Sequence, residues 1–297
     1  MSYPYVRTCI RRTCGVVQLQ SRRLSQGFND EKQHVTVEKQ GNICLIGINR
    51  PEKKNCVNVA TARQLLNAFQ EFDRDDSVAI AVLHGKGGTF CAGFDLEELS
   101  QEENLVIPEG SSPMGPSHMV ARKPTIAAVS GYAVAGGLEL ALLCDLRVVE
   151  DTAVMGVFCR RFGVPLLDGG TVRLPKLIGL SRALDLILTG RPVTGKEAFE
   201  IGLANRIVAC GTGLGQAVAL AANIAKFPQR CVQVDKASAY YSTFDSKSLQ
   251  DALDYEREAG LKVVSVESVE GAKKFMTGVG RHGSFNLLHP PKRSTGT

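Results

Sequence analysis

The sequence contains no tryptophan, and only 6% of its 297 residues are aromatic. Binding of nucleic acid bases on stacked aromatic side chains is therefore not favoured. Charged residues interrupt every apolar stretch before it reaches the roughly 18–20 residues that a membrane-spanning helix needs. The hydrophobic content of 44% is nevertheless enough for a sizeable core. These features indicate a soluble globular protein of one large or two small domains.

Cysteine pairs at metal-binding or redox spacing are also missing. The nine cysteines are an odd number, none belongs to a C-x-x-C pair, and none stands at zinc-site spacing from a histidine. Several, such as Cys44 and Cys144, lie within apolar runs and are typical of small core residues in a reducing compartment. We therefore expect neither disulfides nor a metal site.

Acidic residues are absent from residues 1–29, which hold five arginines. Removing these five from the 35 basic residues leaves 30 basic against 30 acidic residues, so the rest of the chain is formally neutral. A nucleic-acid-binding body is therefore not indicated. The segment contains hydroxyl residues, and Arg22-Arg23-Leu24-Ser25 resembles a processing site. Residues 1–29 thus predict a mitochondrial transit peptide and a matrix protein, with a disordered basic tail as the alternative.

The stretch from Pro124 to Asp145 joins a buried strand to a helix through a glycine-rich turn. The apolar run 125–129 is typical of a strand, and helix-forming residues follow Gly136-Gly137. Helix N-termini present unpaired N–H groups that stabilise a negatively charged oxygen. Glu139 falls in the first helical turn, beside these groups. The stretch predicts an oxyanion-binding site with an adjacent carboxylate, or alternatively an ordinary turn in which Glu139 only complements the helix dipole.

A second glycine-rich loop, residues 85–94, leads into an acidic helix start at 95–99. It lacks the spacing of a phosphate-binding loop, so it does not indicate a nucleotide site. Residues 100–123 hold three prolines and show little periodicity, which predicts a mobile segment over the site.

The remaining patterns repeat a rhythm of two strands and a helix, and then become helical. The domains predicted after the transit peptide are a core at 30–209, a helical region at 210–283 and a flexible tail at 284–297. Strands are expected at 34–38, 43–48, 79–84, 146–149 and 155–158, and helices at 60–73, 182–188, 194–201, 215–225, 248–261 and 266–275.

Together the two glycine-rich turns, FCAGFDL at 90–96 and AGGLELA at 135–141, resemble the crotonase family, also called the enoyl-CoA hydratase/isomerase superfamily. The resemblance covers about residues 34–209. Further motifs agree in order and spacing: Asn49-Arg50-Pro51, Lys123-Pro124, Cys144-Asp145, Gly169-Gly170-Thr171 with Arg173-Leu174, and Leu188-Thr189-Gly190.

The resemblance implies an α/β spiral of repeated ββα units, followed by helices that mediate formation of a homotrimer or a dimer of trimers. It also implies an acyl-CoA thioester as substrate. The backbone N–H groups of Phe94 and Gly136 would polarise the thioester carbonyl and stabilise an enolate. Glu139 matches a catalytic glutamate of the hydratases and would transfer the proton.

The sequence departs from the family pattern at Cys159, where the resemblance places a second hydratase glutamate. A thiol is a poor base for activating water at neutral pH, whereas family members that shift a double bond manage with one glutamate. Asp168 is either a turn or capping residue or an active-site acid, and it lies near an aspartate used by the dienoyl-CoA isomerases of the family. Basic side chains that would bind the CoA phosphates, or would be ordinary solvated charges, are Lys53, Lys54, Lys274 and Arg281.

The sequence therefore predicts a mitochondrial acyl-CoA enzyme with an oxyanion hole and a single glutamate. The reaction expected is of the enoyl-CoA hydratase type, and double-bond isomerisation is the first alternative. Thioester hydrolysis, decarboxylation and a non-catalytic CoA-binding role remain open, whereas an RNA-binding relative is disfavoured by the neutral body. No cofactor is expected besides the CoA of the substrate, and no membrane or nucleic acid partner.

Overall fold

The computed structural model describes residues 32–101 and 112–281. The chain forms two units by its internal contacts, residues 1–32 and 33–297, and the fold below belongs to the second. The transit peptide predicted at 1–29 and the tail predicted at 284–297 lie outside the described residues. Within the described ranges, no helix is both long enough and apolar enough to cross a membrane.

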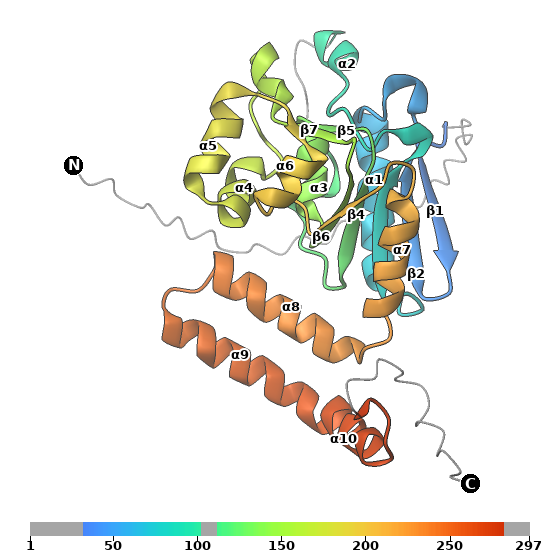
Figure 1. Ribbon diagram of the computed structural model, residues 1–297, viewed down its shortest axis with the longest axis vertical. Helices are drawn as coiled ribbons and strands as arrows, with labels where there is room; N and C mark the ends of the chain where they lie inside the picture. Colours follow the sequence, from blue (N-terminus) through green and yellow to red (C-terminus); the bar gives the residue numbers. More distant parts are fainter. Residues whose placement is uncertain (1–31, 102–111, 282–297) are drawn as a thin grey trace, which may run out of the picture. The chain divides into compact units, whose positions relative to one another are not determined.

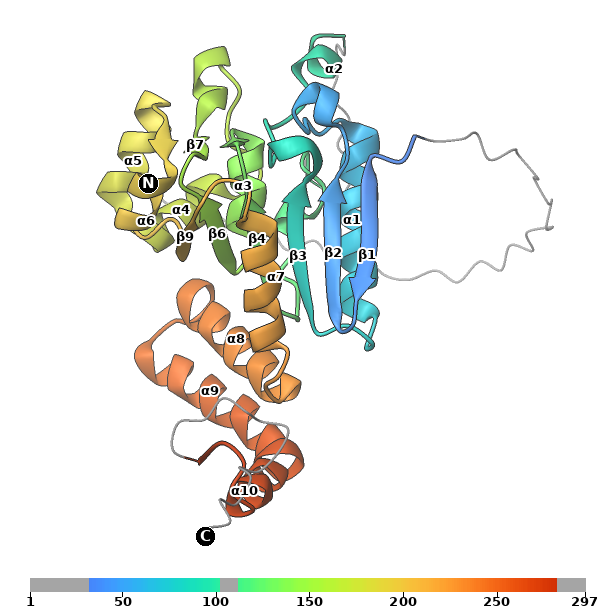
Figure 2. The same cartoon turned by 45° about the vertical axis from the view of Figure 1, so that its right-hand side comes forward.

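The larger of two sheets has six strands in the order β1-β2-β3-β4-β6-β9 (Figures 1 and 2). Its first two strands, both expected from the sequence, form an antiparallel hairpin that turns at Gly41 with a φ of +60°. The other neighbouring strands pair in parallel. The strands are β1 (Val35–Gln40), β2 (Ile43–Ile48), β3 (Ile80–Gly85), β4 (Thr125–Val129), β6 (Leu146–Glu150) and β9 (Arg206–Val208).

The smaller sheet has the order β5-β7-β8, and it receives the second strand of each repeat. Its members are β5 (Tyr132–Val134), β7 (Val154–Gly156) and β8 (Val193–Thr194). The chain thus passes from β4 to β5 and then to helix α3 (Gly136–Leu143), and again from β6 to β7 and on to α4 (Gly170–Ile178). An isolated bridge between Cys91 and Ala133 adds the preceding turn to the same ladder. This is the ββα spiral expected from the sequence.

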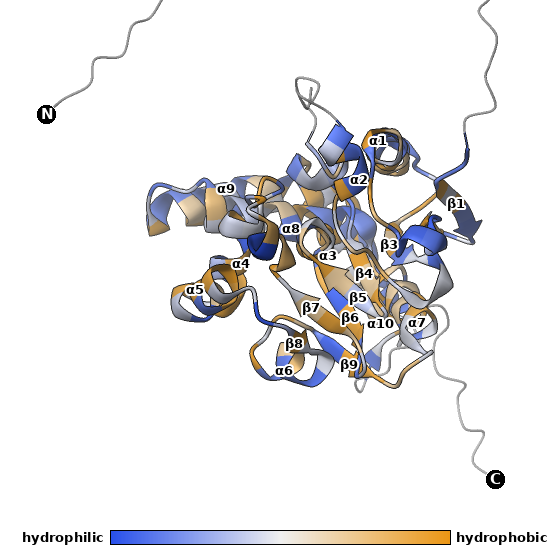
Figure 3. Ribbon diagram, turned by 90° about the horizontal axis from the view of Figure 1, so that it is seen from above, coloured by the Kyte–Doolittle hydropathy of each residue, from blue (hydrophilic) through white to orange (hydrophobic). Residues whose placement is uncertain are grey.

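Opposite faces of the large sheet are covered by different helices. Alternating strand residues, including Ile46 and Leu83, pack with α1 (Val59–Arg74), and the intervening ones, including Leu45 and Val82, pack with α7 (Gly213–Ile224). Figure 2 shows these two helices on either side of the sheet. Because both faces are buried, the inner strands β2, β3 and β4 are continuous apolar runs, whereas the edge strand β1 is largely exposed. Figure 3 shows β4 as hydrophobic and β1 as hydrophilic.

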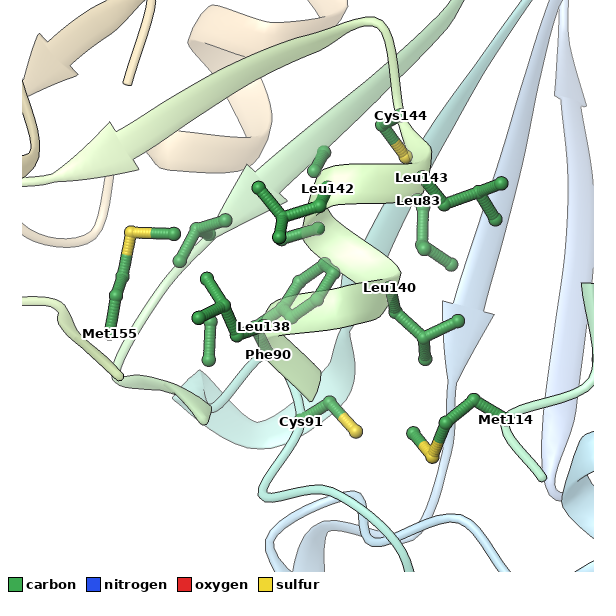
Figure 4. Packing of buried hydrophobic residues seen from close by; sticks show 14 of the residues in the cluster. Leu83, Phe90, Cys91, Met114, Leu138, Leu140, Leu142, Leu143, Cys144 and Met155 are labelled. Atoms are coloured by element: carbon green, nitrogen blue, oxygen red, sulfur yellow. The ribbon is translucent and has the colours of Figure 1, made fainter. Parts of the chain in front are cut away.

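Helix α3 belongs to the same hydrophobic core cluster as α1, and all eight of its residues are buried. Figure 4 shows its leucines packed among side chains of the surrounding strands and loops. Its C-terminal end is closed by Arg147, which is 2% exposed and donates to the carbonyls of Ala141 and Cys144 at 3.5 and 2.7 Å. A buried cation there satisfies backbone acceptors and complements the negative end of the helix dipole.

The remaining helices include one that the sequence pattern did not predict, α8 (Gln229–Phe244). It is attached to the core at Asp145, which pairs with Lys236 at 2.7 Å and accepts a hydrogen bond from Tyr240 at 2.9 Å. The helices predicted at 248–261 and 266–275 are present. The further elements are α2 (Leu96–Gln101), α5 (Leu180–Thr189), α6 (Gly195–Glu200), α9 (Leu249–Val263) and α10 (Val269–Met276), with a π-helical turn at Val264–Ser268 between the last two.

Candidate active site

The two glycine-rich turns lie against each other. Cys91 donates from its N–H to the carbonyl of Tyr132 at 2.8 Å, and its own carbonyl accepts from the N–H of Val134 at 3.1 Å. Gly93 has a φ of +101°, and a Cβ added there would lie 3.2 Å from the nitrogen of Gly136. A side chain at residue 93 would therefore separate the turns. Glycine is required because it permits both the conformation and the close approach.

The N–H groups of Phe94 and Gly136 remain without a hydrogen bond within the part of the chain that the structure describes. Val57 bonds to the residues on either side of Phe94, donating to the carbonyl of Gly93 and accepting from the N–H of Asp95, each at 2.8 Å. Gly136 is the first residue of α3, where an N–H has no partner within the helix. The two donors belong to adjoining turns, so they suit one oxygen atom that gains negative charge.

A buried ion pair between Arg50 and Asp95 stabilises the turn that contains Phe94. Arg50 is 8% exposed, and it contacts the carboxylate of Asp95 at 2.9 Å and the carbonyl of Cys56 at 2.7 Å. A guanidinium with several fixed acceptors is well suited to positioning a backbone turn. Arg50, the central residue of the Asn49-Arg50-Pro51 motif, therefore helps to position the turn that carries the Phe94 N–H group.

Glu139 is 2% exposed and lies in the first turn of α3. Its Oε1 accepts from the N–H groups of Asp168 at 2.9 Å and Gly170 at 2.8 Å. Burial raises the pKa of the Glu139 carboxyl to about 7, despite these two hydrogen bonds, which favour the ionised form. Oε2 makes no hydrogen bond in the described ranges. Glu139 therefore has one oxygen fixed by the backbone, one available for proton exchange, and a pKa suited to both directions of transfer near neutral pH.

A cavity of about 410 Å³ opens in front of these groups. Phe94, Gly136 and Glu139 all line it. Its wall is otherwise largely apolar, which suits a hydrocarbon chain. Apolar residues of the wall are Leu96, Leu99, Pro113, Met114, Phe158, Phe162, Val164, Pro165 and Leu167.

Cys159 also lines the cavity. Burial raises the pKa of the Cys159 thiol, with a further increase from the nearby Glu139 carboxylate. The thiol is therefore neutral near pH 7 and unsuited to activating water. No group of three His, Cys, Asp or Glu side chains that would hold a metal ion is found among residues 32–101 and 112–281.

Asp168 lines the same cavity and is 3% exposed. Its Oδ1 accepts from the N–H of Met114 at 3.0 Å and from the hydroxyl of Ser117, while Oδ2 makes no hydrogen bond in the described ranges. Ser117 and Met114 are fully buried, and Figure 4 shows Met114 close to the start of α3. For residues 112–123, the expectation of a mobile segment is therefore wrong. Of the prolines that suggested it, Pro113 lines the cavity and Pro116 begins a 3-10 helical turn, while residues 102–111 lie outside the described part.

The four basic residues expected to contact CoA do not line the cavity. Lys53 and Lys54 lie near the Phe94 turn, where Lys53 pairs with Glu97 and the carbonyl of Lys54 accepts from the N–H of Ala92. Lys274 is in α10, and Arg281 donates to the carbonyl of Phe275 at the end of that helix. A role in CoA binding stays a prediction for all four, and the structure brings only the first two close to the site's turns.

The family profile for enoyl-CoA hydratase/isomerase matches residues 38–278. The chain belongs to this family. One relative, a probable enoyl-CoA hydratase of Rhizobium meliloti, is 36% identical to this chain over 242 residues, which cover 81% of this chain and 93% of the relative. A probable mitochondrial enoyl-CoA hydratase of Dictyostelium discoideum is 33% identical over 226 residues, covering 75% of this chain and 80% of the relative.

The fold of this enoyl-CoA hydratase/isomerase family member also agrees with solved structures. The crystal structure of an enoyl-CoA hydratase from Mycobacterium tuberculosis superposes with a TM-score of 0.78 at 36% identity, covering 82% of this chain and 96% of that chain. An enoyl-CoA hydratase from Mycobacterium marinum gives the same TM-score at 35% identity over 82% and 96% of the two chains. The crotonase fold expected from the sequence is confirmed.

Proposed function

We propose that the protein catalyses an enoyl-CoA hydratase-like reaction in which Glu139 is the single proton-transferring side chain. The observation that carries this proposal is that three groups line one cavity: the N–H groups of Phe94 and Gly136, which have no hydrogen bond among the described residues, and the buried carboxyl of Glu139. The two N–H groups bind the thioester carbonyl oxygen of an acyl-CoA. Each such donor contributes about 3–4 kcal/mol when it meets the charge of an enolate.

In the hydration direction, Glu139 begins as a carboxylate and accepts a proton from water. The water oxygen bonds to C3 of the 2-enoyl thioester, the double-bond electrons move to the carbonyl oxygen, and the resulting enolate is stabilised by Phe94 and Gly136. Glu139 then returns the proton to C2. A pKa of about 7 for Glu139 supports both halves of this cycle, because neither protonation state is strongly favoured near neutral pH.

Double-bond isomerisation is the second candidate, and Cys159 is the observation that favours it. Hydration with two carboxylates would require a base at this part of the wall, where a neutral thiol stands instead. Isomerisation needs only that Glu139 remove a proton from C2 of a 3-enoyl thioester and deliver it to C4. The same oxyanion hole stabilises the enolate in both reactions.

The physiological setting of the proposal is acyl-CoA metabolism in the mitochondrial matrix. The arginine-rich residues 1–29 support this, as does the relative from Dictyostelium, which is named as mitochondrial. We also propose a homotrimer or dimer of trimers, with CoA phosphates near Lys53, Lys54, Lys274 and Arg281. The reaction as written uses no cofactor besides the CoA of the substrate.

The proposal is tested by turnover of protein lacking residues 1–29 on a 2-enoyl-CoA in water and on a 3-enoyl-CoA. We expect 3-hydroxyacyl-CoA from the first substrate, with the activity lost in Glu139→Gln. Isomerisation without hydration would establish the second candidate. Tight binding of CoA thioesters with neither activity would refute both, and would point to hydrolysis, decarboxylation or a binding role.

A further inference from the structure

A short wall segment, residues 112–118, is joined to the segment 167–170 by side chains on both sides. The hydroxyl of Ser117 donates a hydrogen bond to Asp168 Oδ1, and the N–H of Met114 donates to the same oxygen at 3.0 Å. His118 Nε2 contacts the carbonyl of Leu167 at 2.7 Å. Ser117 is fully buried, and its Oγ also lies 2.5 Å from that of Ser112.

The segment 167–170 is also the segment that holds Glu139. The N–H groups of Asp168 and Gly170 are the only hydrogen-bond donors to the Glu139 carboxylate in the described ranges. Asp168 therefore connects the two regions: its side chain accepts hydrogen bonds from residues 114 and 117, and its backbone N–H donates to Glu139. Since Gly170 is the first residue of α4, the same contacts set where this helix begins relative to α3.

Only Oδ1 of Asp168 takes part in these contacts. Each of its two partners is a donor, and an uncharged amide oxygen at the same position would accept both bonds. These two hydrogen bonds thus require only an acceptor at Oδ1, and Oδ2, which makes no hydrogen bond in the described ranges, is the atom that an acid role would use. A proton-donating role, in contrast, requires a carboxyl group.

We propose that Asp168 and Ser117 are positioning residues that orient Glu139 through the N–H groups of Asp168 and Gly170, and that Asp168 is not a second acid. This inference rests on the proposed role of Glu139 and deepens it. The hydroxyl of Ser117 holds the Asp168 side chain by a hydrogen bond, and this contact positions the segment 167–170. The N–H groups of Asp168 and Gly170 in that segment then orient the Glu139 carboxylate. A displacement of about 1 Å in such a chain is enough to reduce turnover about 100-fold without contact to the substrate.

The test compares Asp168→Asn, Asp168→Ala and Ser117→Ala in the full chain, with Ser238→Ala as a control that removes a different buried hydroxyl, on α8. We expect Asp168→Asn to keep kcat within about 3-fold, because the amide oxygen still accepts both hydrogen bonds. Asp168→Ala should lower kcat about 100-fold and Ser117→Ala about 10-fold, with KM changed less than 2-fold. A loss in Asp168→Asn as large as that in Asp168→Ala would overturn the proposal.

Hydrogen–deuterium exchange, measured by mass spectrometry on peptides covering residues 167–172, supplies a readout that does not depend on turnover. We expect faster exchange in Asp168→Ala and Ser117→Ala, and wild-type exchange in Asp168→Asn and Ser238→Ala. Unchanged exchange in Asp168→Ala would overturn the positioning role even where activity falls. If the wild type turns over no enoyl-CoA, the proposed function fails, and the exchange rates still decide whether these residues fix the turn.

Discussion

Two buried glutamates, Glu139 and Glu150, are held by the same hydrogen-bond pattern in different surroundings. Oε1 of Glu139 accepts from residues 168 and 170 at the start of α4, and Oε1 of Glu150 accepts from Gly211 and Gly213 at the start of α7, both at 3.0 Å. They are 2% and 5% exposed. Each carboxylate therefore caps the N-terminus of a helix, where its charge complements the dipole.

The two glutamates differ in what lies in front of them. Glu139 lines the 410 Å³ cavity beside the N–H groups of Phe94 and Gly136, which make no hydrogen bond in the described ranges, whereas Glu150 does not line it. Burial and capping alone thus do not identify a catalytic carboxylate. Two features distinguish Glu139 from Glu150: it lines a cavity large enough for a ligand, and the cavity also contains N–H groups that can bind that ligand. Substitutions at the two glutamates and their glycines provide matched tests of this distinction.

The largest expected effect is the loss of turnover in Glu139→Gln. Since the amide cannot exchange the proton, kcat should fall by about 1,000-fold, within the range typical of general acid–base groups. Glu150→Gln removes the same charge from a similar cap and should change kcat less than about 3-fold. Steady-state kinetics on an enoyl-CoA check both. An equal loss in the two variants would show that the charge acts through the fold.

The second prediction concerns the pH dependence of stability. The pKa of Glu139 is about 7 in the folded protein against an ordinary 4.5, so the folded state retains a proton that the unfolded state has lost. This contribution to stability is complete below pH 4.5 and disappears as the pH rises through 7. Urea denaturation should show the wild type losing about 3 kcal/mol relative to Glu139→Gln over this range. Parallel pH curves for the two proteins would contradict it.

The third prediction uses the glycines that face each carboxylate. A Cβ at residue 170 would lie 2.9 Å from Glu139 Oε1, and one at residue 213 would lie 3.0 Å from Glu150 Oε1. Gly170→Ala should displace the Glu139 carboxylate and reduce kcat about 100-fold. Gly213→Ala introduces an equal strain and should leave kcat near the wild-type value. A crystal structure of Gly170→Ala with Glu139 unmoved would refute the explanation.

The smallest effect is expected from truncating each cap. Glu150→Ala leaves the N–H groups of Gly211 and Gly213 without their acceptor, at a cost of about 2 kcal/mol. Glu139→Ala should cost less, because water in the cavity can reach the N–H groups it exposes. Urea denaturation at pH 7.5, above the Glu139 pKa of about 7, compares them. A greater loss in Glu139→Ala would reverse the proposed contrast.

The parts of the site predicted from the sequence are those set by local signals. Glycine-rich turns between an apolar run and a helix former predicted an oxyanion-binding site beside Glu139, because turn chemistry and helix initiation are encoded within a few residues. The resemblance to the crotonase family, rather than the turns alone, named Phe94 and Gly136 as its donors. The strand rhythm likewise predicted β1, β2, β3, β4 and β6 of the larger sheet and β7 of the smaller one, but not the short strands β5, β8 and β9. Helix α8 was missed because its apolar and polar residues do not form a clear stripe along the sequence.

The rest of the site depends on contacts between distant segments. Nothing near Ser117 indicates a partner at Asp168, and the neighbouring prolines suggest only a turn. Glu150 ends a strand, where its sequence gives no sign that it caps a helix beginning at Gly213. Such pairs arise from the way successive turns of the spiral stack, and a single sequence carries no local pattern for them.

The stacking of the spiral has a consequence for biosynthesis. The donors of the oxyanion hole come from two successive turns of the chain, and the backbone that holds Glu139 comes from a third. Because a chain emerges from the ribosome N-terminus first, the oxyanion turns exist before α4 is available to orient the carboxylate. A nascent chain that ends before residue 170 therefore contains the residues of both oxyanion turns but lacks the Gly170 N–H group, and the Glu139 carboxylate gains its second hydrogen bond only once the third turn is made.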